Sequence, residues 1–207
     1  MQDLIIMGAG GLAAETYEWI SDYTEYNFSI IFYADFTTQE KLYDIPIVTD
    51  LSKFSDSNFK FLTAVGSPTI KDIFYNKATI LNIQPCDPIY TTRSIISKSV
   101  KLKPNTMVSP NATVTARTSI GHSATIHYGC TIGHDCKIGD FFTALPGSNI
   151  SGNVTIGNYV TVGANASIRE KLYIADNVFI GMGSVVVKNI EESGVYVGNP
   201  AKRIKGI

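Results

Sequence analysis

Residues 119–140 read SIGHSATIHYGCTIGHDCKIGD, and an isoleucine returns at every sixth position of this stretch. The same register continues without insertion or deletion from Ile96 to Val186, and only Ala144 departs from a branched aliphatic residue. The sixteen positions are Ile96, Leu102, Val108, Val114, Ile120, Ile126, Ile132, Ile138, Ala144, Ile150, Ile156, Val162, Ile168, Ile174, Ile180 and Val186. A six-residue period does not match an α-helix. It is the signature of a hexapeptide β-helix, in which each hexad forms one flat side of a coil.

The residues around these sixteen ladder positions fit the corners of such a coil. Small residues stand two places before many of them, namely Ala112, Ala124, Cys130, Cys136, Ser148 and Ala166. Glycine often follows directly, at Gly121, Gly133, Gly139, Gly157, Gly163 and Gly181. Three hexads make one triangular coil, so the ladder predicts about five coils stacked at the ~4.8 Å strand spacing. We expect the ladder side chains to point inward and to stabilise the stack by their burial.

The first 93 residues lack this period and show alternating strand and helix patterns instead. Apolar runs predict strands at residues 4–7, 28–33 and 60–65, and amphipathic stretches predict helices at residues 13–23 and 69–82. Such alternation is typical of a small parallel α/β domain. We therefore expect an α/β domain at residues 1–93 and a parallel β-helix domain at residues 94–207. The tail from Val195 to Ile207 leaves the period and is expected to cap the last coil.

The composition indicates a packed globular protein and excludes some classes of partner. Hydrophobic residues make up 44% of the chain, and 17 basic residues balance 18 acidic ones, so no net charge attracts nucleic acid or an anionic membrane. No apolar run approaches the ~20 residues of a membrane span, and the N-terminus lacks a signal-peptide pattern, so we expect a cytoplasmic protein. Cys86, Cys130 and Cys136 have neither disulfide nor metal-site spacing, and no metal is expected. We interpret Cys130 and Cys136 as small buried filler.

Three segments carry a family resemblance, namely residues 5–11 (IIMGAGG), 133–140 (GHDCKIGD) and 198–203 (GNPAKR). Together with the hexads they resemble the left-handed β-helix acyltransferases. More closely, they resemble the family of sialic acid O-acetyltransferases and nucleotide-amino-sugar N-acetyltransferases. The resemblance covers nearly the whole chain. It implies a left-handed β-helix, a homotrimer, and acetyl-CoA as co-substrate.

The resemblance implies that His134 is the general base and that Asp135 raises its basicity. An amine or hydroxyl that attacks a thioester must lose a proton, and imidazole can accept one near neutral pH. We expect direct attack without an acyl-enzyme, because no cysteine or serine lies in a recognisable nucleophile motif. The alternative interpretation of His134 is a solvated corner residue. His127 is either a contact to the acceptor or a structural corner, and His122 is expected at the surface.

The family's cofactor contacts correspond to Thr143, Ala164 and Met182. Ala164 and Met182 are 18 residues apart, so they are expected to stack on successive coils, where an extended pantetheine chain could lie. Thr143 stands where the family commonly has a second histidine, and it offers a hydroxyl in place of an imidazole. His134 belongs to a different outward corner of the coil. This separation favours a site shared between two subunits, which agrees with the implied homotrimer.

Residues 8–13 (GAGGLA) follow a predicted strand and open a predicted helix, which is the context of a phosphate-binding turn. The resemblance implies that this edge of a Rossmann-like half domain binds the nucleotide-sugar acceptor. The implied contacts are Gly10, Gly11, Leu12, Asp35 and Gly66. Leu12 stands where many relatives have a histidine. Two alternatives stay open: a nicotinamide dinucleotide site, for which the domain has room for only one mononucleotide unit, and a tight turn that binds no ligand.

These expectations converge on an acetyl-CoA-dependent N-acetyltransferase acting on a nucleotide-linked amino sugar, such as a 4-amino-4,6-dideoxy sugar, for a bacterial surface glycan. O-acetylation of a sialic acid or related sugar is a second interpretation, because the same base serves both acceptors. A third is a non-catalytic β-helix binding subunit. His134 and Asp135 argue against that third interpretation, whereas Thr143 and Leu12 leave it open.

Overall fold

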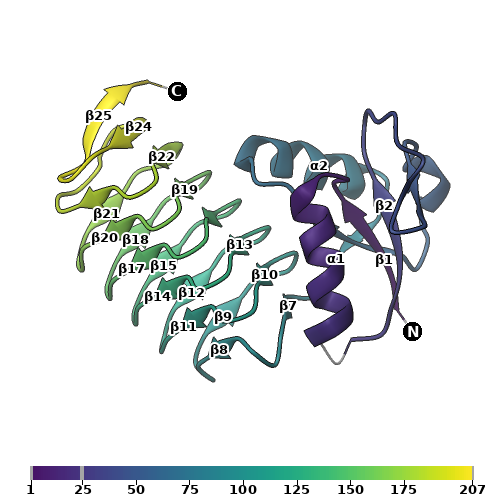
Figure 1. Cartoon of the computed structure of the whole chain (residues 1–207), viewed down its shortest axis with the longest axis horizontal. Coiled ribbons are helices and arrows are strands. Elements are labelled where there is room, and N and C mark those ends of the chain that lie inside the picture. The colour runs from purple at the N-terminus through teal and green to yellow at the C-terminus, as the bar shows by residue number, and fades with distance from the viewer. Residues whose placement is uncertain (1, 24–25, 207) are drawn as a thin grey trace.

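The computed structural model describes residues 2–23 and 26–206 and contains an α/β unit beside a prism of stacked coils (Figure 1). The α/β unit has a six-stranded sheet in the order β3-β4-β2-β1-β5-β6. Its strands are β1 (Gln2–Met7), β2 (Phe28–Tyr33), β3 (Lys41–Leu42), β4 (Ile45–Val48), β5 (Lys60–Thr63) and β6 (Gln84–Pro85). Its helices are α1 (Gly11–Tyr23) and α2 (Pro68–Ile80), with a 3-10 helix at Ser52–Phe54. All neighbouring strands are parallel except β3 and β4, which confirms the predicted α/β class.

Strand β1 is buried at the centre of this sheet, and its side chains alternate between the two faces. Leu4 and Ile6 share a core cluster with Trp19 of α1. Ile5 shares another with Phe74 of α2. The two helices therefore cover opposite faces of the sheet. Each fully buried aliphatic side chain here contributes about 1.5–3 kcal/mol to stability.

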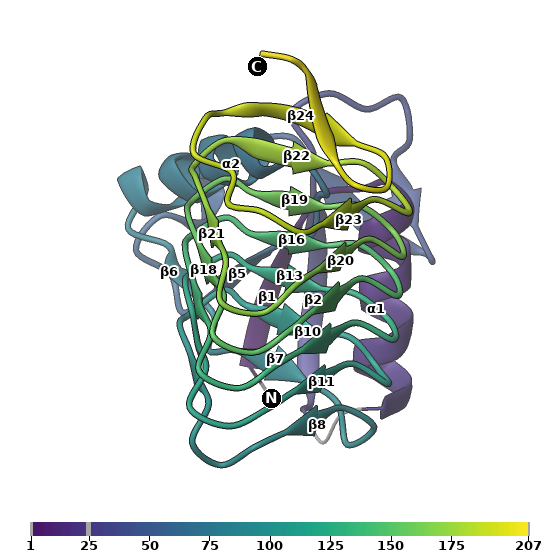
Figure 2. The ribbon, with the colours of Figure 1, turned by 90° about the vertical axis from the view of Figure 1, so that its left-hand side faces the viewer.

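The prism has three parallel sheets, one on each side of the coil (Figure 2). The first sheet contains β7 (Ile89–Tyr90), β10 (Met107–Val108), β13 (Thr125–Ile126), β16 (Thr143–Ala144), β19 (Thr161–Val162) and β22 (Val178–Ile180), followed by β24 and β25. The second contains β8 (Ile95–Ile96), β11 (Thr113–Val114), β14 (Thr131–Ile132), β17 (Asn149–Ile150), β20 (Ser167–Ile168) and β23 (Val185–Val186). The third contains β9 (Lys101–Leu102), β12 (Ser119–Ile120), β15 (Lys137–Ile138), β18 (Thr155–Ile156) and β21 (Tyr173–Ile174). The expected left-handed parallel β-helix is confirmed.

Every ladder residue is the last residue of one of these strands, and its side chain points into the prism. Only Ile96 and Leu102 are partly exposed, because no coil lies beneath them. Phe142 explains the exception at Ala144. It is fully buried in the same core, two places before Ala144, where many other hexads, including both neighbouring ones, have a smaller residue. The large side chain of Phe142 is thus combined with the small side chain of Ala144, so this hexad fills about the same core volume as its neighbours.

The chain leaves the period after the last ladder residue, as predicted. Strand β24 (Gly194–Val197) lies parallel to β22, and β25 (Lys202–Lys205) returns antiparallel to β24. The two strands extend the first sheet beyond its last regular coil. Ile207, the final residue of the predicted tail, lies outside the described residues.

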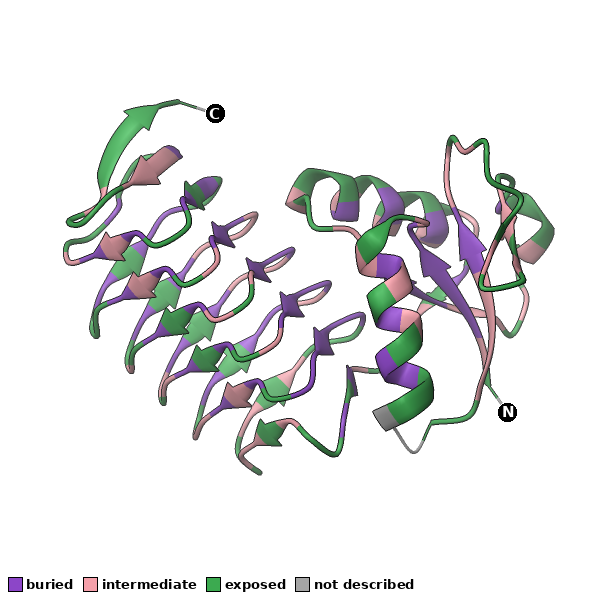
Figure 3. Cartoon of the chain, in the orientation of Figure 1, coloured by how far each residue is buried: buried purple, intermediate pink, exposed green. Residues whose placement is uncertain are grey.

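The sheet that begins with β7 faces the α/β unit, and its outward residues from β7 to β19 are buried there (Figure 3). Met107 belongs to the core cluster of α1 and accepts a hydrogen bond from Oγ1 of Thr16 at 3.7 Å. Oδ1 of Asn105 accepts one from the backbone N–H of Thr63 at 2.8 Å. The seam between the two parts is therefore packed and hydrogen-bonded. The division of the chain at residues 93 and 94 stays a prediction.

The described helices are all too short or too polar to cross a membrane.

Candidate active site

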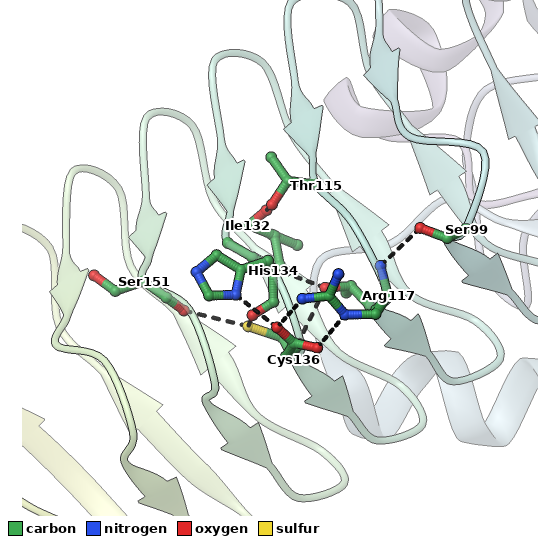
Figure 4. Close-up of polar contacts among 10 residues, drawn as sticks. Ser99, Thr115, Arg117, Ile132, His134, Cys136 and Ser151 are labelled. Atoms are coloured by element: carbon green, nitrogen blue, oxygen red, sulfur yellow. Dashed lines mark hydrogen bonds and ion pairs between the residues drawn. The ribbon is translucent and has the colours of Figure 1, made fainter.

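His134 lies at an exposed corner between the second and third sheets, two residues after the end of β14 (Figure 4). Its Nδ1 is 2.7 Å from Oδ2 of Asp135. The Asp135 carboxylate also accepts two hydrogen bonds from Arg117, at 2.7 Å from Nε to Oδ1 and 2.7 Å from Nη2 to Oδ2. Arg117 stands 18 residues before Asp135, on the preceding coil. Sequence reasoning predicted the first two members of this array and missed the third.

The charges of the array determine which imidazole nitrogen is free. The Arg117 guanidinium and the His134 ring hold the pKa of the Asp135 carboxyl well below its usual range. The carboxylate in turn raises the pKa of Arg117. An ionised carboxylate can only accept hydrogen bonds, so Nδ1 of His134 must carry the proton that points at Asp135. In the neutral imidazole, Nε2 is then the unprotonated nitrogen, which is the form a general base requires.

Gly152 makes room for the outer edge of this imidazole. It stands 18 residues after His134, one coil further along the same column. A Cβ at Gly152 would lie 2.7 Å from Nε2 and 2.8 Å from Cε1 of His134. The same column contains Ala116 before His134 and Glu170 after Gly152, so the coil itself accepts a side chain there. The glycine is thus required by the ring and not by the turn.

The two thiols near this corner do not compete for the chemistry. Cys130 and Cys136 have no exposed surface, as the filler interpretation predicted. Burial raises the pKa of both thiols, so the nucleophilic thiolate is disfavoured. Within the described residues, no three His, Cys, Asp or Glu side chains are grouped as a metal site would need.

The other two histidines lie in the seam with the α/β unit. The His122 ring stacks on Tyr75 of α2 with 4.7 Å between centroids, and its Nε2 is 3.2 Å from Asp140. Burial lowers the pKa of His122. His127 is only 6% exposed, and burial, with Lys71 nearby, lowers its pKa to about 4. Neither ring nitrogen of His127 has a hydrogen-bond partner among the described residues. The expectation of a surface position for His122 was wrong.

The three predicted cofactor residues do not share one environment. Ala164 and Met182 follow β19 and β22 at the corner between the first and second sheets, and Gly183 N–H donates to the Ala164 carbonyl at 2.8 Å. Met182 is 82% exposed. Thr143 is instead fully buried in the seam, where it accepts a hydrogen bond from Nζ of Lys71 at 2.7 Å. Its assignment to the cofactor stays a prediction, although in this conformation it has no exposed surface.

The glycines predicted to bind the acceptor border open space. A Cβ at Gly10, Gly11 or Gly66 would meet no described heavy atom within 4 Å. Gly8 differs, because its φ of 140° and a contact of 2.5 Å with the Ala64 carbonyl oxygen require a glycine for the turn itself. Leu12 is half-buried in the first turn of α1. This turn contains no acidic residue, so no side chain within it neutralises the positive end of the helix dipole. The open glycines at this helix end suit an approaching phosphate.

Asp35 lies at the same edge of the sheet but is already paired. It accepts hydrogen bonds from the hydroxyl of Tyr33 and from Nζ of Lys77. Burial acts to raise the pKa of Asp35, but these two hydrogen bonds outweigh it and the pKa is lowered. Asp35 and Phe36 line a cavity of about 590 Å³ together with three threonines. The sequence analysis did not single out Lys77.

Comparison with known proteins finds one family match and several relatives with local sequence similarity. Residues 3–78 match the family model of the PglD N-terminal domain. A chloramphenicol acetyltransferase of Klebsiella aerogenes is 38% identical over 65 residues, which cover 31% of this chain and 31% of that protein. A probable UDP-3-O-acylglucosamine N-acyltransferase of Arabidopsis thaliana is 42% identical over 52 residues, covering 25% of this chain and 17% of that protein. The matches therefore span less than a third of these curated relatives.

Two solved structures extend the likeness to the full length. The acetyltransferase domain of PglB from Neisseria gonorrhoeae has a TM-score of 0.87 at 27% identity and covers 99% of this chain and 100% of that one. The same domain has been solved with acetyl coenzyme A. PerB from Caulobacter crescentus, in complex with CoA and GDP-perosamine, has a TM-score of 0.88 at 23% identity and covers 99% and 98%, which indicates a shared fold. Residues 3–78 therefore match a PglD N-terminal domain, and over its whole length the chain is similar to solved acetyltransferase structures.

Proposed function

We propose that this protein is an acetyl-CoA-dependent N-acetyltransferase that acts on a nucleotide-linked amino sugar. The acceptor is the 4-amino group of a 4-amino-4,6-dideoxy sugar, and the product serves a bacterial surface glycan. The observation that carries the proposal is the exposed array of Arg117, Asp135 and His134, in which Asp135 contacts Nδ1 and leaves Nε2 free to accept a proton. Two comparisons support the reaction type. The PglB domain was solved with acetyl coenzyme A, and PerB was solved with CoA and GDP-perosamine.

The chemistry follows from the state of the imidazole. Nε2 of His134 accepts the proton that the attacking amine loses as it bonds to the thioester carbonyl carbon. Asp135 stabilises the imidazolium that forms. His134 then returns the proton to the CoA sulfur as the carbon–sulfur bond breaks, which yields an amide and a free thiol. No acyl-enzyme is needed, in keeping with the buried thiols of Cys130 and Cys136.

We assign the acceptor nucleotide to the glycine edge of the α/β unit, with contacts at Gly10, Gly11, Leu12, Asp35, Gly66 and His127. The open space at the three glycines and the unneutralised end of α1 suit a diphosphate. His127 is included because the family resemblance places it near the acceptor; both of its ring nitrogens are buried in the seam and unpaired among the described residues.

We assign acetyl-CoA to the column of Ala164 and Met182. The small side chain of Ala164 and the exposed, apolar Met182 fit an extended pantetheine arm lying along stacked coils. This column and His134 lie at different corners of one chain, so the complete site requires a second copy. We therefore propose a homotrimer with sites between subunits, for which light scattering should give three times the chain mass of 22.5 kDa.

The direct test is a free-thiol release assay with acetyl-CoA and a panel of acceptors. Nucleotide-linked 4-amino sugars should release thiol at roughly 1–10³ turnovers per second and gain about 42 Da, whereas sialic acids should not. Turnover with sialic acids alone would replace N-acetylation by O-acetylation. Binding of NADH at micromolar affinity would support the dinucleotide alternative.

Two variants separate catalysis from a passive binding subunit. His134→Gln should abolish thiol release while the protein still binds the nucleotide sugar. His122→Gln is the matched control, since His122 also pairs with a carboxylate at a coil corner but lies in the seam. Equal activity of the two variants, or no turnover by the unmodified protein with any acceptor, would contradict the proposal.

A further inference from the structure

Arg117 is anchored from the coil that precedes it. Its backbone N–H donates to Oγ of Ser99 at 2.9 Å, and its backbone is left-handed with φ of 57°. Ser99, Arg117 and Asp135 follow one another at intervals of 18 residues, so they form one column beside His134 (Figure 4). The guanidinium is thus held next to Asp135 by the regular stacking of the coils.

The contact with Asp135 uses the full fork of the guanidinium. Nε and Nη2 meet separate carboxylate oxygens, both at 2.7 Å, which fixes the plane of the carboxylate as well as its position. Oδ2 is also the atom that accepts from Nδ1 of His134. The Arg117 side chain is 66% exposed and that of Asp135 is 31% exposed. An ion pair this exposed adds little to stability, so its contribution lies in orientation.

We propose that Arg117 is a positioning residue that holds Asp135 in the orientation from which it selects the Nδ1–H tautomer of His134. This inference rests on the proposed role of His134 as the base. Without the fork, the partly exposed carboxylate can turn toward solvent, and the imidazole is released to its other tautomer. In that tautomer Nε2 carries the proton and cannot accept one from the attacking amine.

The first test reads the tautomer directly and needs no activity. In protein labelled with ¹⁵N at histidine, the ring nitrogen shifts report which nitrogen is protonated, and His134→Gln assigns the signals. We expect mainly the Nδ1–H form in the unmodified protein and a clear rise of the Nε2–H form in Arg117→Met. Lys171→Met is the matched control, because Lys171 is an exposed cation in the same column, two coils beyond Asp135. It should leave the tautomer unchanged, and an unchanged tautomer in Arg117→Met would overturn the proposal.

The second test asks whether the fork or the charge matters. Arg117→Lys keeps the charge but cannot bind both oxygens in one plane. We expect kcat to fall about 10- to 100-fold in Arg117→Met, with little recovery in Arg117→Lys and unchanged KM for both substrates. Full recovery by lysine would reduce Arg117 to a neutralising charge and contradict the positioning role.

The third test asks whether Arg117 acts through Asp135. In an Asp135→Ala background, Arg117→Met should have little further effect on kcat, since the carboxylate that Arg117 orients is gone. Additive losses would overturn the proposal. If the unmodified protein transfers no acetyl group, the proposed function fails, whereas the tautomer measurement still decides the role of Arg117.

Discussion

The imidazole of His134 lies against the α-carbon of Gly152, so closely that a methyl group on that carbon would stand 2.7 Å from Nε2. We expect Gly152→Ala to fold normally, because the φ of Gly152 is not among the left-handed values and the obstructing ring can rotate away. The displaced ring should lose its alignment, and kcat should fall about 10-fold or more. Thermal unfolding and thiol release measure the two effects.

Glu170→Ala is the control for this substitution, because Glu170 occupies the next place in the same column. It should leave both the melting temperature and kcat unchanged. A Gly152→Ala protein with full activity would mean that the ring position seen here is not the one used in catalysis.

Mixed oligomers test whether one site draws on two subunits. His134→Ala lacks the base, and Ala164→Trp obstructs the proposed acetyl-CoA column. Each should be inactive alone. Co-refolded in equal amounts, they should recover about a quarter of the unmodified activity, because a quarter of the shared sites combine both intact residues in a closed trimer. No recovery, with mixing verified by mass spectrometry, would place base and cofactor on one chain.

Lys71 makes stability depend on pH in a defined direction. It is completely buried, and burial holds its pKa well below the ordinary value. Between the folded and unfolded pKa values the unfolded chain binds more protons, so stability rises with pH up to about 10.4, by at most about 1.4 kcal/mol per pH unit. Lys71→Met should abolish this rise and stabilise the fold at pH 7. The Phe142 carbonyl that Lys71 contacts also accepts from the Thr125 N–H, so no backbone acceptor is left unpaired.

Lys77 of the same helix supplies the control, because the hydrogen bond to Asp35 raises its pKa. Its stabilisation is present below the unfolded pKa and is lost as pH rises through the folded value. Between pH 7 and 10 Lys77 is protonated in both the folded and the unfolded chain, so Lys77→Met should lower the stability measured by urea unfolding without changing its slope against pH. If the free energy of unfolding of Lys71→Met and of the unmodified protein had the same slope against pH, Lys71 would be protonated in the folded protein.

The sequence predicted the β-helix well because the same six-residue period sets which side chains are buried and where the coil turns a corner. What it did not show is where the backbone turns left-handed. From Asn105 to Gly183, the residue three places after each ladder residue has a left-handed backbone. Arg117, Phe141 and Tyr159 occupy such positions, as several asparagines do. The predicted glycines one place after the ladder serve another need, since a Cβ at Gly133 would meet the next coil at 2.5 Å. In the α/β unit, β3 and β4 were missed because Tyr43 and Asp44 form a left-handed hairpin turn without glycine.

The candidate site was predicted as far as motif and period allow. His134 and Asp135 come from the motif, and the period alone could have pointed to Arg117 and Gly152, since both stand 18 residues from a member of the motif. Lys71 could not be found in this way. A lysine on an amphipathic helix is almost always solvated, and only the packing of α2 against β16 shows that this one is buried. The same packing explains why Thr143 is hidden.

The pairing of Phe142 with Ala144 can be tested as an exchange of volume within one core. Phe142→Ala alone should destabilise by about 3–5 kcal/mol through the cavity it leaves. Ala144→Ile alone should cost about 1–3 kcal/mol by overpacking. The double variant has a small residue two places before an isoleucine, as the neighbouring hexads do. Its free energy of unfolding should therefore exceed the value expected from adding the two single losses, with a coupling of about 1–3 kcal/mol in urea unfolding. Pairing Phe142→Ala with Val114→Ala, which lies in a different coil, should be additive to within about 0.5 kcal/mol. Additivity in both pairs would mean that Ala144 is small for a reason other than Phe142, and the ladder would need a separate explanation at that position.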